Sequence, residues 1–367
     1  MAGLYVHIPF CRQACHYCNF HFSTSLRDRD EMLDALIREI RLRKDYPGGE
    51  ALDTVYFGGG TPSLPEAAWI ARLMETIREN FSIRPEAEVT LEANPDDVTE
   101  EKIPHWKSAG INRLSIGVQS FFTEDLQWMN RSHDAEQAVQ SIRLAQQHFA
   151  DLNVDLIYGF PLLSDDKWKQ NVERVVSWNI PHLSCYALTV EPRTALQKML
   201  REPLDGGKQA DQFLLLMGWL RDAGYEHYEI SNFAKPGHRS RHNTSYWLGK
   251  KYLGIGPSAH SFDLESRQWN VSNNAQYRES LARGVVPFEK EALSPLQKQN
   301  EYIMTSLRTI EGLDLSRFSE TEQSRLLAAA RTFLDAGRML HSGERLQLTD
   351  EGKLFADGIA AELFFSQ

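Results

Sequence analysis

Short apolar runs alternate with amphipathic stretches over the first two-thirds of the chain. The apolar runs predict strands at 4–8, 54–57, 88–92, 113–118, 153–157 and 183–188. Apolar residues with helical spacing predict helices at 30–43, 65–80, 135–149, 167–178 and 209–223. Successive β/α units predict a parallel sheet, either open and doubly wound or closed into a complete or partial barrel. In both architectures, functional residues lie at the carboxyl ends of the strands.

The final third of the chain has a different pattern. Residues 231–290 are rich in aromatic side chains but contain only short apolar runs, so we expect a loop-rich extension there. The remaining residues, 291–367, contain two helical patterns, an alternating stretch and a last helix, at 297–309, 320–336, 338–348 and from 349 onwards. Helix, helix, small hairpin and helix is the order of a winged-helix-like domain. We therefore expect domains at 1–230, 231–290 and 291–367.

The composition limits the classes of function. The 367 residues include 40 Lys and Arg against 50 Asp and Glu, a formal charge of −10, and 42% are hydrophobic. This composition is typical of a soluble globular protein, and the negative charge argues against broad binding to nucleic acids or anionic membranes. The longest strongly apolar stretch, 213–220, is far shorter than the roughly 20 residues of a membrane-spanning helix. No secretory signal is visible, so we expect a cytoplasmic protein.

Three of the four cysteines are clustered. Cys11, Cys15 and Cys18 follow the first predicted strand, whereas Cys185 lies in the sixth among apolar residues and is expected to be buried. Disulfide-rich proteins distribute their cysteines through short secreted chains, so the cluster indicates metal binding. Three thiolates on one loop favour a [4Fe–4S] cluster with one open iron. The alternative is a zinc site completed by His7, His16 or His21.

Further motifs accompany the cysteines. They are YVHIPFC at 5–11, GGGTP at 58–62, EANP at 92–95, GVQS at 117–120 and DLIYG at 155–159. Together with the cysteine spacing, they resemble the radical S-adenosylmethionine (radical SAM) superfamily. Within it, they resemble the group of oxygen-independent coproporphyrinogen III dehydrogenases and heme chaperones. The resemblance covers essentially the whole chain and implies a partial parallel (β/α)6 barrel of the TIM type with a C-terminal helical, winged-helix-like domain.

The resemblance also implies roles for individual residues. The open iron would take the amino and carboxylate groups of SAM, and the protein would supply ligation, orientation and exclusion of water. Residues expected to hold this SAM are Tyr5, Gly59 and Glu92. A second SAM site, expected in this group, corresponds to Gly60, Thr61, Gln119, Arg131 and Asp155. Without the resemblance, the glycine run is a tight turn, and Gln119 and Asp155 are polar strand ends bonded inside the barrel.

Two features separate the dehydrogenases from the heme chaperones. The dehydrogenases have a further cysteine two positions after the third one, where this chain has Phe20. The run RHNTSYW at 241–247 contains the HNxxYW element typical of the heme chaperones. A neutral imidazole is a natural axial ligand of heme iron, so His242 is the expected heme ligand and His260 the second choice. From the residues alone, the favoured interpretation is that His242 and Asn243 organise their loop by hydrogen bonding.

The sequence therefore predicts a radical SAM-type heme chaperone that binds a [4Fe–4S] cluster, SAM and heme. It would pass heme to client hemoproteins such as respiratory cytochromes, and a cluster-dependent homodimer is compatible with this interpretation. Coproporphyrinogen dehydrogenase activity is not expected, although that enzyme is the main alternative. A heme-degrading or alkyl-transferring radical enzyme and a zinc-stabilised interaction module are more distant possibilities.

Overall fold

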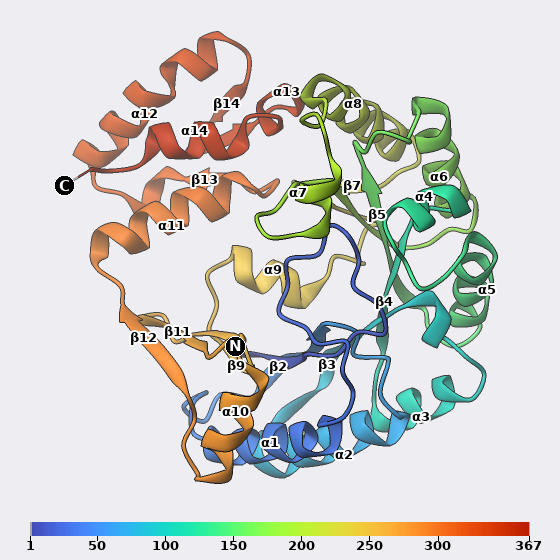
Figure 1. The fold of residues 1–367 in the computed structure, drawn as a ribbon. Helices are drawn as coiled ribbons and strands as arrows, with labels where there is room; N and C mark the ends of the chain where they lie inside the picture. Colours follow the sequence, from blue (N-terminus) through green and yellow to red (C-terminus); the bar gives the residue numbers. More distant parts are fainter. Residues whose placement is uncertain (1, 367) are drawn as a thin grey trace.

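The N-terminal part of the protein is a curved parallel sheet. The computed structural model describes residues 2–366 (Figure 1). Six neighbouring parallel strands follow chain order: β1 (Ala2–Ile8), β2 (Leu52–Gly59), β3 (Ile83–Ala93), β4 (Arg113–Gln119), β5 (Asp151–Tyr158) and β6 (His182–Ala187). The six predicted strands are confirmed, and most are longer than expected. The fold class is the expected partial β/α barrel.

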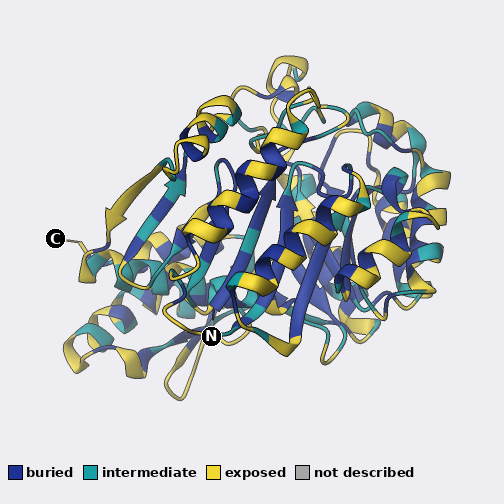
Figure 2. Cartoon of the chain, turned by 90° about the horizontal axis from the view of Figure 1, so that it is seen from below, coloured by how far each residue is buried: buried dark blue, intermediate teal, exposed yellow. Residues whose placement is uncertain are grey.

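Helices cover the outer face of the sheet. They are α1 (Arg29–Leu42), α2 (Ala67–Asn80), α3 (Lys102–Ala109), α5 (Ala135–Gln146), α6 (Asp165–Ser177) and α8 (Gly206–Asp222). Shorter turns are η1 (Pro95–Asp97), α4 (Thr123–Trp128) and α7 (Ala195–Met199). In Figure 2, these outer helices are buried toward the strands and exposed toward solvent. Helix α3 was not predicted because it is short and contains Pro104, which its first turn tolerates.

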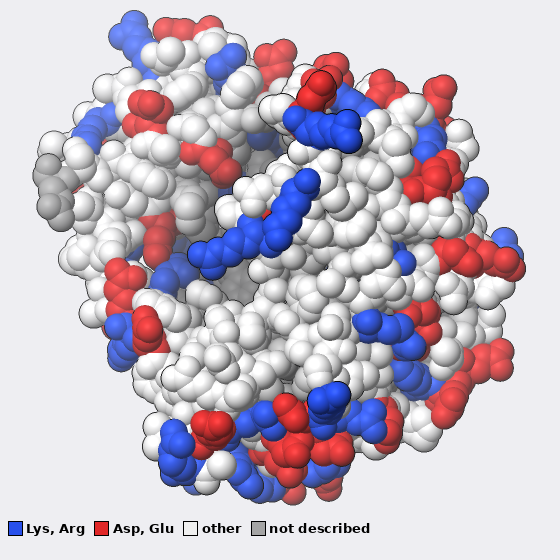
Figure 3. All heavy atoms as spheres, in the orientation of Figure 1, with Lys and Arg blue, Asp and Glu red and all other residues white. Residues whose placement is uncertain are grey.

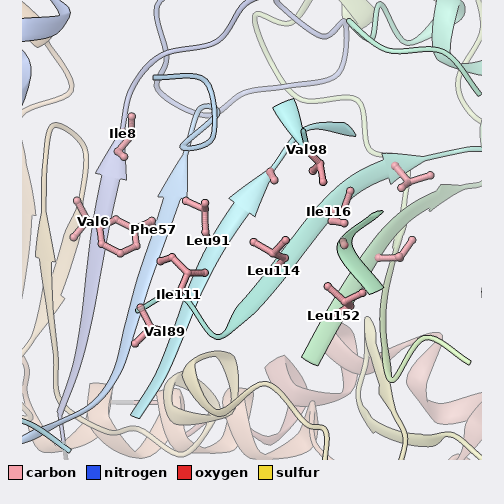
Figure 4. Packing of buried hydrophobic residues seen from close by; sticks show 14 of the residues in the cluster. Val6, Ile8, Phe57, Val89, Leu91, Val98, Ile111, Leu114, Ile116 and Leu152 are labelled. Atoms are coloured by element: carbon pink, nitrogen blue, oxygen red, sulfur yellow. The ribbon is translucent and has the colours of Figure 1, made fainter. Parts of the chain in front are cut away.

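Apolar side chains between the strands and the helices form the main core. Val6, Ile8, Phe57 and Leu91 are buried, and Figure 4 shows them on successive strands. Parallel strands covered by helices have nearly continuous apolar runs, and β1 is buried at every position except Tyr5. This packing fixes the positions at which the strands end, and therefore the positions of the loops that follow them.

The expected loop-rich extension at 231–290 needs correction. It contains β8 (Asn232–Ala234), α9 (Arg241–Trp247), β9 (Tyr252–Ile255), β10 (His260–Phe262), β11 (Ser266–Asn270), α10 (Asn274–Ala282) and the start of β12 (Phe288–Ala292). Strand β9 pairs in parallel with β1, and β8 and β7 (Glu226–Glu229) continue the sheet beyond β6. These strands have only three to five residues each, which is too short for a recognisable apolar pattern. In β11, the buried Asn270 is satisfied by donating to the buried Glu39 carboxylate at 2.7 Å.

The C-terminal part has its own core and the expected order of helix, helix, hairpin and helix. Its elements are α11 (Pro295–Leu307), β13 (Leu313–Asp314), η2 (Leu315–Arg317), α12 (Glu320–Asp335), β14 (Met339–Ser342), β15 (Arg345–Leu348), α13 (Asp350–Lys353) and α14 (Ala356–Leu363). Ile303, Leu326 and Leu346 are among its core residues. An ion pair between Arg308 and the buried Glu229 of β7, at 2.9 Å, joins this part to the sheet.

Candidate functional site

The cysteine loop lies between β1 and α1, at the carboxyl edge of the sheet. Cys11, Cys15 and Cys18 are free and half-buried. The Cys11 amide donates to the Ser23 carbonyl at 3.0 Å, and the Cys18 amide donates to the Cys15 carbonyl at 3.2 Å. The Thr61 hydroxyl donates to the Cys11 sulfur at 3.5 Å. The three thiols are thus held on a folded loop beside the end of β2.

The middle of this loop is tied to the segment that follows α4. The Asn130 amide donates to the Ala14 carbonyl at 2.7 Å, and Gln13 donates to the Asn130 side chain at 2.6 Å. His16 Nδ1 lies 2.8 Å from the Trp128 carbonyl, so this nitrogen carries the proton. These bonds fix the middle of the loop that carries the cysteines.

The thiol chemistry fits an iron–sulfur cluster. The pKa of Cys11 is raised to about 11, mainly by burial and in smaller part by the neighbouring Cys18 and Cys15. Three adjacent thiolates therefore need positive charge, which iron ions supply. In a [4Fe–4S] cluster each cysteine binds a different iron, so the sulfurs need not converge on one point.

The structure does not support the zinc alternative. Within residues 2–366, no three His, Cys, Asp or Glu side chains are arranged to hold a single metal ion. Both ring nitrogens of His7 are hydrogen-bonded, whereas His16 and His21 each use one ring nitrogen in a hydrogen bond. His7 Nε2 lies 2.8 Å from the His21 carbonyl, and His21 Nε2 lies 2.7 Å from Asn274 Oδ1. His16 is held by the Trp128 carbonyl.

The glycine run after β2 supports the cysteine loop. The Gly60 amide donates to the Ile8 carbonyl at 2.9 Å, and the Thr61 amide donates to the Phe10 carbonyl at 2.7 Å. A Cβ on Gly60 would lie 2.6 Å from the Phe10 oxygen. Gly59 has a φ of 114°, which side chains other than glycine rarely adopt. Packing therefore requires these glycines, independently of whether their backbone approaches SAM.

Glu92 and Tyr5 lie at the same edge. The Tyr56 hydroxyl donates to Glu92 Oε1 at 2.8 Å, and the Tyr5 and Tyr56 rings stack with centroids 6.1 Å apart. Burial raises the pKa of Glu92 to about 7, and the Asp155 charge adds to this effect. The Gly59 amide, which donates to Glu92, opposes it. Glu92 is thus a half-buried, desolvated carboxylate that would gain from a cationic or hydroxyl-bearing partner.

The residues expected at a second SAM site differ in how many of their polar atoms already have hydrogen-bond partners. Arg131 donates to Asn94 Oδ1 at 2.8 Å and to the Gly117 carbonyl at 2.7 Å, and its Nη1 lies 3.4 Å from the Cys15 sulfur. Its guanidinium is therefore largely engaged, although the buried Nε has no partner among residues 2–366. Asn94 belongs to the EANP run, but nothing in that run indicates that it bonds to Arg131.

Gln119 and Asp155 complete this group. Gln119 has a φ of 66°, and its buried Oε1 has no hydrogen-bond partner in the described chain. A strained backbone and an unsatisfied buried acceptor at one residue are typical of binding sites. Burial raises the pKa of Asp155 to about 6, and Asn153 donates to its Oδ1 at 2.6 Å.

His242 is buried and fully hydrogen-bonded. Its ring is 1% exposed, with Nδ1 at 2.7 Å from the Thr54 hydroxyl and Nε2 at 2.8 Å from the Tyr246 hydroxyl. Burial lowers the pKa of His242 to about 3, with the Arg113 charge as a second cause. The structure therefore places the expected heme ligand behind Tyr246, with neither ring nitrogen free.

A cavity that sequence analysis missed lies beside the cysteine loop. Its volume is about 820 Å³, and it is bordered by the cysteine loop, the end of α9, strands β9 to β11, and α11. Tyr5 and Phe20 line it on the cysteine side, and Tyr246 and Trp247 of the HNxxYW element line it from α9. The face drawn in Figure 3 is hollowed between the barrel and the C-terminal part, with Lys and Arg side chains at the edge of the hollow.

No helix within residues 2–366 is long and apolar enough to cross a membrane. Cys185 is buried, as expected, and burial raises the pKa of its thiol.

Comparisons with known proteins agree with the geometry. Residues 5–175 match the family model of the radical SAM superfamily, and residues 293–355 match that of the HemN C-terminal domain. The heme chaperone HemW of Mycobacterium tuberculosis is 35% identical, over 98% of this chain and 94% of that protein. HemW of Escherichia coli is 30% identical, over 100% of this chain and 98% of that protein. The solved structure of coproporphyrinogen III oxidase (HemN) from Escherichia coli matches with a TM-score of 0.87 and 26% identity, covering 99% and 90% of the two chains.

The barrel, the cysteine loop and the C-terminal domain define the class of a radical SAM protein with a HemN-type C-terminal domain. Since relatives named HemW share at least 30% identity over nearly the whole length, the chain belongs to the HemW family.

Proposed function

We propose that this protein is a heme chaperone that binds a [4Fe–4S] cluster, SAM and heme, and delivers heme to client hemoproteins. The observation that carries the proposal is the cavity of about 820 Å³ beside the cysteine loop, lined by the HNxxYW aromatics Tyr246 and Trp247. Its volume lies within the roughly 300–1,000 Å³ typical of small-molecule sites. The names of its relatives support heme as the occupant.

The cluster and SAM would occupy the carboxyl edge of the barrel. Cys11, Cys15 and Cys18 would bind three irons, and the fourth would take SAM, which supplies a deoxyadenosyl radical when the cluster is reduced. Glu92 would accept hydrogen bonds from the ribose or ammonium groups of SAM. Tyr5 would cover one side of that SAM, and the Gly59 backbone would approach it closely.

A second SAM would lie beside Gly60, Thr61, Gln119, Arg131 and Asp155. The unsatisfied Oε1 of Gln119 supports this proposal because a bound ammonium or hydroxyl would satisfy it. Arg131 is committed to Asn94 and Gly117. Arg131 would therefore bind a carboxylate only through its remaining N–H groups, and not through two free N–H groups side by side.

Coproporphyrinogen III dehydrogenase is the second candidate, since the solved HemN structure matches nearly the whole chain. The chain departs from that enzyme at Phe20, which is 68% exposed and lines the cavity. A bulky apolar side chain at this position suits a flat macrocycle better than the further cysteine of the dehydrogenases would. We therefore favour heme binding over decarboxylation.

The remaining parts of the proposal concern the cellular location, the client proteins and the oligomeric state. A cytoplasmic location, heme delivery to respiratory cytochromes, and a homodimer that depends on the cluster are all compatible with the structure. The negative charge of the chain makes nucleic acid an unsuitable partner for the C-terminal domain.

Anaerobically reconstituted protein should be given hemin and, in a parallel reaction, coproporphyrinogen III with SAM and a reductant. The proposal predicts about one tightly bound heme per chain and no protoporphyrinogen. Decarboxylation without stable heme binding would establish the dehydrogenase instead.

A further inference from the structure

The cavity beside the cysteine loop exposes apolar side chains from four separate segments. Four lining residues rank among the exposed large hydrophobic side chains of residues 2–366: Phe20 at 68%, Leu248 at 51%, Leu264 at 45% and Met304 at 40%. Grouped apolar exposure around one opening is typical of a binding site. Leu264 also has a φ of 80°, which is strained for a side chain of this kind.

Three histidines line this cavity, and they differ in the state of their ring nitrogens. His7 is held by the His21 carbonyl and Tyr5, and His21 is held by Asn274. The His260 ring is exposed, and no hydrogen bond to it is found among residues 2–366. Partial desolvation, with the Arg267 charge as a second cause, lowers the pKa of His260, which favours the neutral imidazole that can bind a metal.

The charged residues of the cavity are mostly cationic. Arg267, Lys298 and Arg317 line it together with a single carboxylate, Glu301. Arg267 is paired with Glu301 at 2.8 Å, and Lys298 is paired with the exposed Glu265 at 2.5 Å. Arg317 lies over the Tyr302 ring at 4.6 Å and has no ion pair in the described part of the chain. A cationic lining in a protein of net charge −10 is suited to a ligand that carries carboxylates.

His242 contributes to this cavity indirectly. It does not line the cavity, but its Nε2 lies 2.8 Å from the hydroxyl of Tyr246, which does. The other ring nitrogen is held by Thr54. His242 thereby fixes the side chain that forms one wall, and loss of its ring would change the shape of the cavity without removing a metal ligand.

From these observations we propose that heme binds in this cavity with His260 as its axial ligand and Arg317 on a propionate, and that His242 is a positioning residue. This inference rests on the proposed heme chaperone function and specifies its heme site. The apolar side chains Phe20, Leu248, Leu264 and Met304 would cover the macrocycle. Neither His260 nor Arg317 has to break a hydrogen bond or an ion pair shown in the structure, whereas His242 would have to break two.

The ligand assignment is tested by titrating hemin into the full-length, cluster-loaded protein and recording absorption and resonance Raman spectra. His260→Ala should lower hemin affinity at least about tenfold and remove the imidazole-ligated spectrum, which added free imidazole should restore. His242→Ala should weaken hemin binding while keeping the wild-type spectrum. His341→Ala is the matched control, because His341 lies on the exposed hairpin strand β14 away from the cavity.

Several outcomes overturn the proposal. They are an unchanged spectrum in His260→Ala, or loss of the imidazole signature in His242→Ala or His21→Ala but not in His260→Ala. Iron and sulfide content equal to wild type shows that each variant is folded. If the wild-type protein itself binds no hemin, the proposed function fails, and not only the ligand assignment.

The propionate assignment is tested with hemin and hemin dimethyl ester, which lacks the carboxylates. Arg317→Gln should weaken binding of hemin several-fold and leave binding of the ester unchanged, since only the carboxylates meet the guanidinium. Arg331→Gln, at an exposed position on α12, is the control. Equal weakening for hemin and its ester, or no weakening of hemin, would remove Arg317 from this role.

Discussion

The cysteine loop and the neighbouring cavity are built in opposite ways. The loop is held by many hydrogen bonds, including those from Asn130 and to Ser23, and its three thiols are half-buried. The cavity wall also contains hydrogen bonds, such as that of Tyr246 with His242, but the opening exposes apolar side chains such as Phe20 and Leu248 and a cation without an ion pair in the described chain, Arg317.

This difference matches what each region would hold. A metal cluster needs ligands at fixed positions, and the hydrogen-bonded loop would provide them for the proposed cluster. A transferred ligand such as heme must leave again, so its site gains from apolar cover and from few strong fixed contacts. The contrast suggests that the cluster is resident and that heme is cargo.

Removing the thiolates should have the largest effect. In a variant with Cys11, Cys15 and Cys18 all changed to Ala, bound iron and acid-labile sulfide should fall from about four of each per chain to background. Iron and sulfide analysis after anaerobic reconstitution measures this. Cys185→Ala should retain both elements, because that thiol is buried in β6 away from the loop. A triple variant that stays brown would show that the cluster binds elsewhere.

His242→Ala should destabilise the cluster-free protein by about 2–3 kcal/mol, because two hydrogen bonds and a buried stacked ring are lost. The difference should shrink in acid. The pKa of His242 is depressed in the folded state, so its stabilising contribution is present above the unfolded pKa of about 6.5 and is lost as the pH falls toward 3.

Urea unfolding at pH 7.5 and pH 5 measures both effects. The exposed His341→Ala should change little at either pH. If His242→Ala were as stable as wild type, the hydrogen bonds of the His242 ring would contribute nothing to the stability of the fold.

Glu92→Gln should lower SAM affinity about tenfold and stabilise the cluster-free protein by about 1 kcal/mol at pH 8. The pKa of Glu92 is raised to about 7, so its ionisation costs stability as the pH rises from about 4.5 through 7. The neutral amide avoids this cost. At pH 5 the stability difference should nearly disappear.

Calorimetric SAM titration and thermal unfolding at the two pH values check this prediction. Glu79→Gln, exposed on α2, is the control for a change of net charge. If Glu92→Gln bound SAM as tightly as wild type, the Glu92 carboxylate would not contact SAM.

Leu264→Asn should have the smallest effect on stability. Asparagine tolerates a positive φ better than leucine does, so the change should stabilise the protein by about 0.5 kcal/mol while weakening hemin binding a few-fold. Leu162→Asn is a matched control, since Leu162 is also 45% exposed but is not among the positive-φ residues. If both variants change stability and hemin affinity equally, the positive φ of Leu264 does not contribute to hemin binding.

Local motifs made part of the site predictable from sequence. The cysteine spacing and the glycine run lie within short segments, and β/α periodicity placed both at the carboxyl edge of the sheet. The six parallel strands and most outer helices followed from the same periodicity, because each buries a continuous or periodic apolar face. Cys185 was correctly expected to be buried.

The rest depended on contacts between distant segments. The pairing of β9 with β1 joins residues about 250 positions apart, and β9 has no apolar pattern long enough to predict it. The cavity is lined from the cysteine loop, α9, β10 and α11, so no single segment reveals it. The HNxxYW element indicated a heme site, but the sequence could not show that Tyr246, and not His242, faces the cavity.

The most direct test counts iron, acid-labile sulfide and bound heme in one anaerobically prepared sample of the full-length protein. We predict about four irons and four sulfides in a cluster that does not depend on heme, and about one heme that a client apo-hemoprotein can remove while the cluster stays in place. Heme that cannot be transferred would contradict the claim that heme is cargo. A sample without a cluster that still binds heme and SAM normally would contradict the claim that the cluster is a permanent part of the site.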